Sequence, residues 1–286
     1  MALTPPPKEV RQRSILRNSN SSSEGATGRS SMLTLERRKL LLRVADVFFY
    51  GGESPLPEVD VVFFFHSAAP QGRAREVRTL HLDLSRSEDA LFAQCARNNR
   101  YKISRAGARD GLSFRMFSKP SEQQTATFLA FYDGFARGMG LAGVSSHKVR
   151  KIEALRSTGG LWISRIQAPD GEDLCYHSYI VDGRRARLFH SASHFRAEEG
   201  SARRSLIGRA NRYLHWRGIL HFKALDLAIY DFGGLTPGSE EHRNIDEFKL
   251  SFGGAPVTEF SGVEGRTLLG RIATCFVDRG PRATQD

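Results

Sequence analysis

Two stretches near the C-terminus carry most of the information about the fold: Tyr230-Asp231-Phe232-Gly233-Gly234 and Phe248-Lys249-Leu250-Ser251-Phe252-Gly253-Gly254. The first places an acid and two glycines at the end of a predicted strand. The second places Lys249 on a short predicted helix, again before two glycines. Because glycine adds no side-chain bulk, such ends allow the backbone to approach a ligand closely. The pattern indicates a ligand site, and a loop that borders the core is the alternative explanation.

The residues before these stretches show clear periodicity. Three strands, predicted at residues 161–167, 174–181 and 187–193, are joined by turns at Pro169-Asp170-Gly171 and Asp182-Gly183, which is typical of an antiparallel meander. Apolar residues at steps of three and four then predict a long helix over residues 201–216. A strand at 224–230, a helix at 244–250, a last strand and a helix at 268–276 complete this half.

The first half alternates less regularly. Leu33, Leu35, Leu40 and Val44 suit a helix of mixed charge. Further on, a helix is expected to begin after Ser85 or Ser87 and to continue into a basic stretch. The remaining expected elements are strands at 59–66, 79–84 and 111–117 and helices at 121–137 and 146–156. The βα rhythm of a doubly wound sheet is missing, so the pattern predicts an α+β fold with a mixed, mostly antiparallel sheet flanked by helices.

Composition limits the partners and the compartment. The 286 residues include 42 Lys and Arg against 31 Asp and Glu, a formal net charge of +11. This balance favours anionic partners, namely phosphate-bearing ligands, RNA or an anionic membrane surface, or else it only keeps the protein dispersed. Three separated cysteines without a metal-binding spacing indicate a reducing compartment. We also expect no secretory signal and no transmembrane segment, which favours the cytoplasm.

Several common catalytic motifs are missing from the sequence. It contains no P-loop, no strand-linked GxGxxG, no HExxH and no GxSxG. His190 and His194 lie four residues apart at a predicted strand end, with no evident third ligand, so no metal is predicted. The sequence therefore gives no motif evidence for three functions: phosphoryl transfer by a P-loop, dinucleotide binding, and hydrolysis by a nucleophile elbow.

The order of meander, long helix and two glycine-pair motifs resembles the FemAB-like group of the GNAT acyltransferases. The stretch Arg100-Tyr101-Lys102-Ile103-Ser104-Arg105-Ala106 is similar to the basic helix in the first half of these proteins. The likeness covers about residues 79–262. It implies a GNAT-like fold; one arrangement joins a degenerate first half at 32–145 to a complete second half at 146–278, with tails at 1–31, expected to be disordered, and 279–286.

The resemblance implies direct transfer of an acyl group, acetyl above all, to an amine. The acceptor would be a cell-envelope sugar, a polysaccharide precursor or a small amine. The donor would be acyl-CoA or, as in Fem-type peptidyltransferases, aminoacyl-tRNA. Many Fem-type enzymes that use tRNA carry a helical arm. This sequence contains no heptad run that would predict such an arm. A non-catalytic GNAT-like binding protein is the alternative of another class.

Direct transfer needs a neutral amine, a polarised carbonyl and a protonated leaving group, but no protein nucleophile. We expect Asp231 to accept a proton from the amine or to orient it. Lys249 would stabilise the negative charge on the reacting carbonyl, as the resemblance implies. Tyr230 would protonate the leaving group, unless it is a core tyrosine. The alternative bases are His177, His190 and His194.

The binding residues are expected on two basic stretches. Related acyl-CoA users have Q/R-x-x-G-x-G/A before the long helix, whereas this chain has Arg196-Ala197-Glu198-Glu199-Gly200-Ser201-Ala202, one residue longer and with two acids. The donor would be held by Arg196, Gly200, Arg203 and Arg204, of which the last two also suit a solvated helix start. The expected substrate contacts are Arg100, Lys102, Arg105, His190, His194, Gly233 and Gly234. A solvated helix face is the alternative for the three cations.

Overall fold

The computed structural model describes residues 32–194, 200–236, 238–240 and 242–275. Within this part the chain forms ten strands and seven helices, so the predicted α+β class is confirmed. The predicted tails, 1–31 and 279–286, lie outside the described residues. None of the described helices is long and apolar enough to cross a bilayer.

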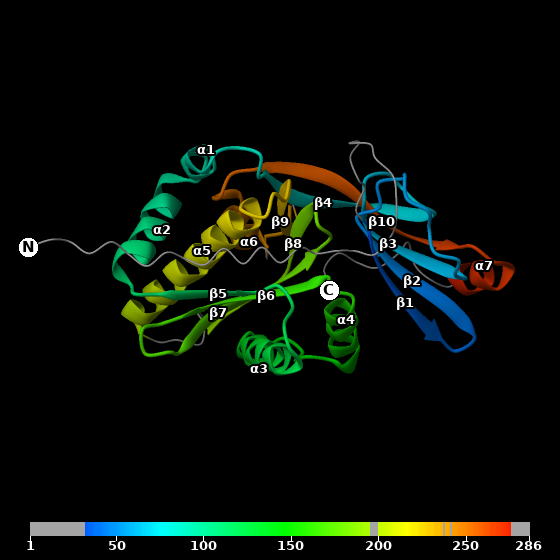
Figure 1. The fold of residues 1–286 in the computed structure, drawn as a ribbon, viewed down its shortest axis with the longest axis horizontal. Coiled ribbons are helices and arrows are strands. Elements are labelled where there is room, and N and C mark those ends of the chain that lie inside the picture. The colour runs from blue at the N-terminus through cyan, green and yellow to red at the C-terminus, as the bar shows by residue number, and fades with distance from the viewer. Residues whose placement is uncertain (1–31, 195–199, 237, 241, 276–286) are drawn as a thin grey trace, which may run out of the picture.

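The ten strands form one sheet in the order β1-β2-β3-β10-β4-β9-β8-β7-β6-β5 (Figure 1). Neighbouring strands are antiparallel except for the pairs β2–β3 and β8–β9, which are parallel. The strands are β1 Leu33–Lys39, β2 Leu42–Phe48, β3 Val61–Ser67, β4 Arg73–Asp83, β5 Ser113–Phe117, β6 Leu161–Gln167, β7 Asp173–Val181, β8 Arg185–Ser193, β9 Ile229–Leu235 and β10 Ala255–Gly265.

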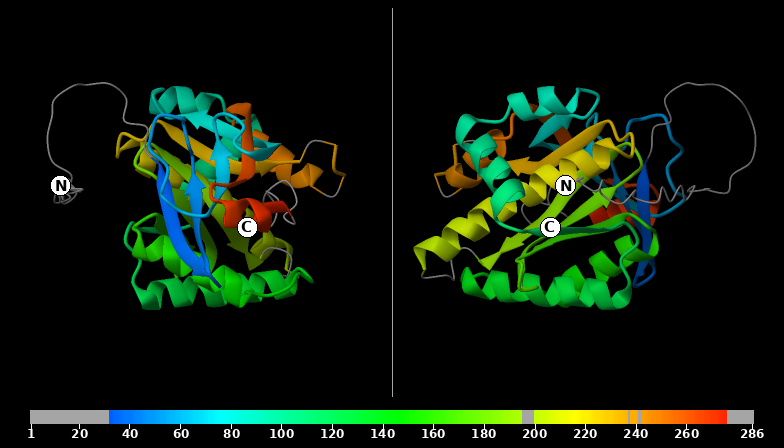
Figure 2. Two further views of the ribbon diagram at one scale, coloured as in Figure 1. Left: turned by 90° about the vertical axis from the view of Figure 1, so that its right-hand side faces the viewer. Right: turned by 60° about the vertical axis from the view of Figure 1, so that its left-hand side comes forward.

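Helices cover both faces of this sheet (Figure 2). One face packs against α1, α2, α5 and α6 through a core that includes Leu80, Tyr230 and Phe252. The other face packs against α3 and α4 through Phe128 and Ile152. The helices are α1 Glu88–Ala93, α2 Arg97–Arg109, α3 Glu122–Gly138, α4 Ser146–Ser157, α5 Ser201–Lys223, α6 Arg243–Leu250 and α7 Leu268–Cys275.

The C-terminal strand returns to the first part of the sheet. β10 lies between β3 and β4 and pairs antiparallel with both. The helix α7 follows and packs against β10 and β3. The predicted boundary between residues 145 and 146 falls directly before α4, and the division of the chain into two halves stays a prediction.

Local signals in the sequence place several helices correctly. Ser87 is the N-cap of α1, and its side chain accepts a hydrogen bond from the Ala90 N–H at 3.2 Å. Ser121 and Gln124 form a capping box at the start of α3. The helix α5 runs past the predicted end at residue 216 because Ile219 and Phe222 continue its buried face.

Two predicted elements are wrong. Residues 33–44 form the hairpin of β1 and β2, not a helix. Leu40 and Leu41 are the exposed turn of that hairpin, so their side chains do not continue a buried helical face. The strand predicted at residues 224–230 begins only at Ile229, and it runs through the glycine pair to Leu235.

Candidate functional site

The two parallel strands β8 and β9 separate at the centre of the sheet. They pair at Arg185 with Ile229, Ala186 with Tyr230, and Arg187 with Asp231, and no further pair joins their described residues. Beyond this point β8 stays paired with β7, and β9 stays paired with β4. The predicted catalytic residue Asp231 therefore lies where the sheet divides.

Asp231 is fully buried and accepts hydrogen bonds from both sides. Its Oδ2 accepts from Arg187 Nη1 at 2.8 Å and from Arg185 Nε at 3.0 Å. Its Oδ1 accepts from the Thr79 hydroxyl and from the Gly233 N–H at 2.8 Å. Burial alone would raise the pKa of the Asp231 carboxyl, but the charges of Arg187 and Arg185 outweigh it and hold that pKa well below its usual range.

Arg185 links Asp231 to a second buried acid. Its Nη1 and Nη2 donate to Glu259 Oε1 and Oε2 at 2.8 and 2.9 Å. Glu259 Oε2 also lies 3.1 Å from His66 Nδ1, and Arg185 Nη2 lies 2.8 Å from His81 Nε2. We call this group the charge cluster; it consists of His66, His81, Arg185, Arg187, Asp231 and Glu259.

The charge cluster includes a set of side chains with metal-ligating atoms. One atom each of His81, Asp231 and Glu259 lies within 4.8 Å of the others. The guanidinium of Arg185 contacts all three residues and already supplies the positive charge among them. The donor set is therefore occupied by an arginine, which is the simplest account of three buried ligand-type groups at this place.

The opposite face of the same strands carries a chain of buried hydrogen bonds. Successive residues of a strand point to opposite faces, so Tyr230 faces α5 while Asp231 faces the charge cluster. The Tyr230 hydroxyl lies 2.9 Å from His215 Nδ1. His177 Nε2 lies 2.8 Å from Asn211 Oδ1, and its Nδ1 lies 3.2 Å from the Tyr179 hydroxyl. Tyr230 is a fully buried core residue, the alternative that the sequence left open.

Lys249 reaches β9 from α6. Its Nζ donates a hydrogen bond to the carbonyl of Gly234, and its side chain is partly buried. Burial lowers the pKa of the Lys249 ammonium to about 8, and the nearby charge of Arg187 acts in the same direction. Among the described residues Lys249 forms no salt bridge with Asp231. Instead, the two side chains bind neighbouring residues of β9, Gly233 and Gly234.

The glycine pair of β9 contacts protein atoms. Gly233 has φ +83, and a Cβ there would lie 3.2 Å from the carbonyl oxygen of Leu188 on β8. The carbonyl oxygen of Gly233 also lies 3.0 Å from the Thr79 hydroxyl oxygen, whose one proton is shared with Asp231. Gly233 is thus required where β9 bends away from β8, because a side chain would be strained at this φ.

The histidines expected as alternative bases lie on both faces. Burial lowers the pKa of His177 to about 4, and the imidazole faces α5. His190 Nδ1 lies 3.0 Å from the Ser178 hydroxyl, and its ring packs on Tyr132 of α3. The His194 ring packs on Phe131 at a tilt of 59°, with the ring centres 4.4 Å apart. The structure does not bring these three together.

The three expected cations of α2 separate. Arg100 donates to the carbonyl of Ala93, the last residue of α1, and to that of Cys95 in the following turn. Arg105 is exposed, and its Nη1 lies 3.4 Å from the Tyr101 hydroxyl. Lys102 is half-buried and faces α5, and its pKa is lowered by burial and then by the charges of Arg212 and Arg209. Of the three, only Lys102 is close to the cations Arg209 and Arg212 of α5.

Arg212 of α5 was missed from the sequence, and its positive charge helps to lower the pKa of Lys102. Its guanidinium carbon is 4.9 Å from the ring centre of Phe248, the residue before Lys249. Arg209 forms a bidentate salt bridge with Asp110. Among the described residues neither Lys102 nor Arg212 has a carboxylate partner. Two partly buried cations without a counter-charge favour an anionic ligand.

The residues expected to hold a donor lie at the start of α5. Gly200 is the N-cap of the helix. Arg203 pairs with Glu172 of the turn between β6 and β7, and Arg204 is exposed. Arg196 lies outside the described residues. Five members of the charge cluster were not identified from the sequence: Arg185, Arg187, His66, His81 and Glu259. The one sequence signal that could have pointed to some of them is the alternation of charged with apolar residues in β4 and β8.

Comparison with known proteins places this geometry in a fold group. The sequence matches no family model and no curated protein sequence. The crystal structure of FemX superposes with a TM-score of 0.52 at 14% identity over 70% of this chain. The fold is FemAB-like and of the GNAT type. The resemblance drawn from the glycine-pair motifs is thus confirmed at the level of the fold.

Two further solved structures are similar to this chain to about the same degree. The C-terminal domain of a putative lysylphosphatidylglycerol synthetase from Agrobacterium fabrum has a TM-score of 0.50 at 14% identity, over 86% of this chain and 84% of that domain. A conserved protein of unknown function from Bacteroides thetaiotaomicron has a TM-score of 0.50 at 10% identity, over 82% of both chains. The chain spans 63% of the length of FemX.

Proposed function

We propose that the protein is an N-acyltransferase that moves an acyl group from a phosphate-bearing donor directly to an amine. The observation that carries this proposal is the position of Lys249, whose ammonium is hydrogen-bonded to β9 next to the point where β8 and β9 separate. A cation fixed at such a place stabilises negative charge that develops on a reacting carbonyl. Lys249 keeps its proton at neutral pH because its pKa is about 8.

In our proposal Asp231 positions the part of β9 to which Lys249 is hydrogen-bonded. Its carboxylate holds the Gly233 N–H, while Arg185 and Arg187 keep it ionised. A carboxylate that already accepts several hydrogen bonds and has a lowered pKa is a weak proton acceptor. The role of Asp231 as the base for the amine stays a prediction, and it is separable from the positioning role by experiment.

The donor is proposed from two cations, Lys102 of α2 and Arg212 of α5. Lys102 and Arg212 suit a phosphate group because neither has a carboxylate partner among the described residues. Acyl-CoA is the proposed donor, with an acetyl group as the simplest acyl unit, and aminoacyl-tRNA is the alternative. The proposed acceptor is an amine of a cell-envelope sugar, of a polysaccharide precursor or of a small molecule. Reduced cysteines favour a cytoplasmic reaction.

A non-catalytic binding protein is the second candidate. The observation that favours it is the saturation of Asp231, which leaves the site without an evident general base among the described residues. Such a protein would bind a phosphate-bearing ligand at Lys102 and Arg212 without transferring an acyl group.

Ligand stabilisation followed by turnover tests the proposal. Acetyl-CoA, a mixture of aminoacyl-tRNAs and nucleotide sugars are compared by thermal denaturation, since a ligand at 100 times its dissociation constant adds ~2.7 kcal/mol to stability. Release of free CoA thiol is then followed with a panel of amines, for wild type, Lys249→Met and Lys249→Arg. Stabilisation with turnover that disappears in Lys249→Met supports transfer. Stabilisation without any turnover supports the binding protein.

A further inference from the structure

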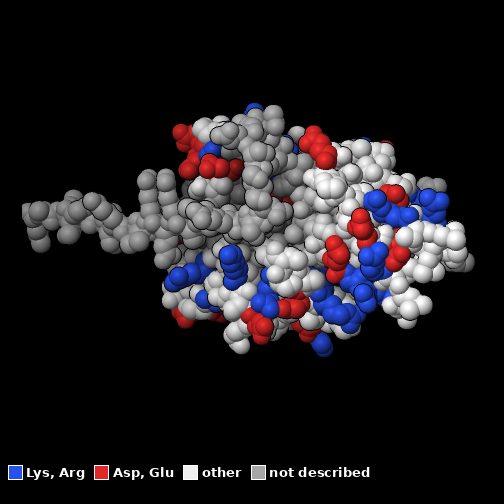
Figure 3. All heavy atoms as spheres, turned by 45° about the vertical axis from the view of Figure 1, so that its right-hand side comes forward, with Lys and Arg blue, Asp and Glu red and all other residues white. Residues whose placement is uncertain are grey.

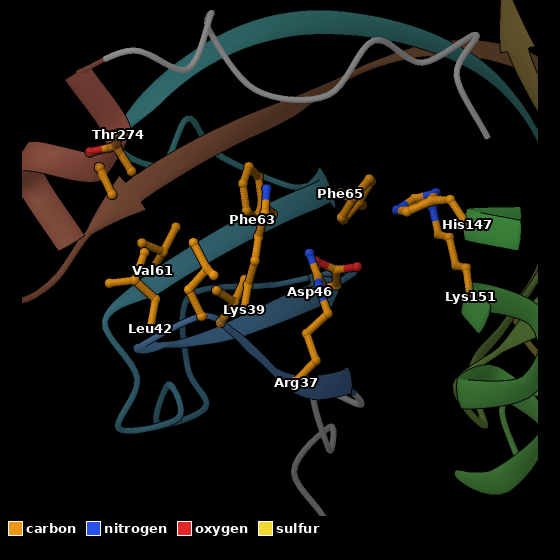
Figure 4. A pocket seen from close by; sticks show the side chains of 13 residues that line it. Arg37, Lys39, Leu42, Asp46, Val61, Phe63, Phe65, His147, Lys151 and Thr274 are labelled. Carbon is orange, nitrogen blue, oxygen red and sulfur yellow. The ribbon is translucent and has the colours of Figure 1, made fainter.

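A cavity lies on the β1–β2–β3 part of the sheet. It has a volume of about 550 Å³ and is bounded by α4 and α7 (Figure 4). Its floor is apolar and is made by Leu42, Val44, Val61, Phe63 and Phe65. Its volume is in the range that binds small molecules or lipid headgroups.

The charged groups of this cavity are mostly cationic. Arg37, Lys39 and Lys151 line it together with His147, against the single carboxylate of Asp46, which pairs with Arg37 at 2.5 Å. On the side of the molecule that carries β1, β2 and α7, Lys and Arg side chains are interspersed with Asp and Glu (Figure 3). An anionic group is therefore the complementary partner of this face.

Large apolar side chains project beside the cavity. Leu40 and Leu41 form the turn between β1 and β2, and they are 95% and 91% exposed. On α7, Leu268 is 77% exposed, and Leu269 and Ile272 are exposed as well. Leu40 and the α7 residue Ala273 line the same cavity, so the two elements border one surface. We call Leu40, Leu41, Leu268, Leu269 and Ile272 the apolar patch.

The backbone of the turn makes Leu40 unusual. Its φ is +55, a left-handed conformation that favours glycine or asparagine. A leucine at this position strains the backbone, and its side chain buries almost nothing within the described structure. The helix α7 is comparable, since its buried residues are Gly270 and Thr274 while its large side chains face outward. Large apolar groups placed in this way indicate a partner outside the described residues.

We propose that the apolar patch docks the protein on the surface of a bilayer that contains anionic lipid. The leucines of the hairpin turn and α7 enter the boundary between headgroups and acyl chains, and Lys39 and its cationic neighbours in the cavity contact lipid phosphates. A second copy of this chain is a poorer occupant, because a symmetric contact would bring the same cations of both copies together. The docking does not depend on the transfer reaction proposed above.

Co-sedimentation of the full-length protein with vesicles tests the docking. The vesicles are phosphatidylcholine alone, or phosphatidylcholine with one third phosphatidylglycerol, and neither donor nor amine is present. We expect binding to the anionic vesicles that weakens as salt increases. The variant Leu40→Ser/Leu41→Ser should lower the partition coefficient about tenfold or more, because burial of one leucine accounts for about that factor.

Matched controls separate docking from general effects. Leu141 and Leu225 are also exposed, 57% and 47%, and lie elsewhere in the fold. The variant Leu141→Ser/Leu225→Ser should bind the vesicles like wild type. Lys39→Gln should weaken binding to anionic vesicles, whereas Lys119→Gln, an exposed lysine after β5, should not. Unchanged melting temperatures show that all variants are folded.

Three results would overturn the docking. The first is no sedimentation of wild type with anionic vesicles. The second is equal loss of binding in the Leu40→Ser/Leu41→Ser variant and its control. The third is a dimer in sedimentation velocity that the same two substitutions dissociate, which would assign the apolar patch to a contact between copies. Because vesicle binding is measured without turnover, none of these results bears on the acyltransferase proposal.

Discussion

Asp231 and Lys249 bind two consecutive residues of strand β9 from different elements. The Gly233 N–H donates to Asp231 Oδ1 at 2.8 Å, and Lys249 Nζ donates to the Gly234 carbonyl. The carboxylate and the ammonium are thereby coupled through the backbone of β9 and not by a direct ion pair. A change at Asp231 is consequently expected to displace the anchor of Lys249.

Lys249→Met should lower the turnover of acyl transfer by ~100-fold or more, the scale of one lost oxyanion donor. Lys249→Arg keeps the charge and should retain part of the activity. Wild type loses its ammonium proton as the pH rises through about 8, so the ratio of Lys249→Arg to wild-type turnover should increase above that pH. Turnover profiles between pH 6.5 and 9.5 measure this ratio, and a constant ratio would contradict the role of the charge.

The same lowered pKa has a consequence for stability. Between about pH 8 and pH 10.4 the unfolded chain keeps a proton on Lys249 that the folded chain has released. This group therefore makes the free energy of unfolding rise with pH in that window. Denaturant titrations of wild type and Lys249→Met should show a smaller rise in the variant. An identical pH dependence would mean that the Lys249 amine is not buried as the structure shows.

Asp231→Asn should destabilise the fold by ~3–5 kcal/mol, because it leaves Arg185 and Arg187 buried without their shared carboxylate. Since the folded pKa of Asp231 is lowered, its contribution is present above about pH 3.9 and is lost as the pH falls towards the folded value. Urea unfolding gives the change in stability. If Asp231→Asn keeps wild-type stability but loses turnover that recovers at high pH, Asp231 is the base for the amine and the positioning role is wrong.

His177 should make the protein less stable in mild acid. Burial lowers its pKa to about 4, so between about pH 6.5 and pH 4 the unfolded chain binds a proton that the folded chain excludes. The free energy of unfolding should fall by ~3 kcal/mol across this window from His177 alone. His177→Gln should show a shallower decline in urea unfolding, and His147→Gln, an exposed control, should follow wild type. If the free energy of unfolding of His177→Gln fell with decreasing pH as steeply as that of wild type, the imidazole of His177 would not be buried in its uncharged form.

The cations of α2, together with Arg212 of α5, should separate into two roles. Lys102→Gln and Arg212→Gln should raise the apparent Michaelis constant for the donor more than they lower turnover, and the effect should shrink with added salt. Arg100→Gln should instead lower the melting temperature, because Arg100 holds the carbonyls at the end of α1. Arg105→Gln, at an exposed position, serves as the control. If Arg100→Gln and Lys102→Gln changed the Michaelis constant equally, the separation into two roles would be wrong. The two cations would then bind the substrate together, as expected from the sequence.

Local patterns were sufficient for the meander and for most helices. The strands β6, β7 and β8 follow from strand-length runs joined by short turns, and α3 follows from its amphipathic pattern. These signals act between residues close in the chain, so a sequence displays them directly. They failed at Leu40 and Leu41, because exposed leucines in a tight turn have the same spacing as a buried helical face.

The amino-acid sequence by itself determined the α+β class, the FemAB-like motif order and the candidates Asp231 and Lys249. Only the tertiary structure decided that β10 enters the sheet between β3 and β4, and that Arg185 joins Asp231 and Glu259, which lie 46 and 74 residues away. Such contacts depend on which strands become neighbours and in which register. Pairing of distant strands is a property of the whole sheet, and burial then forces each charged side chain to find a partner that no local pattern names.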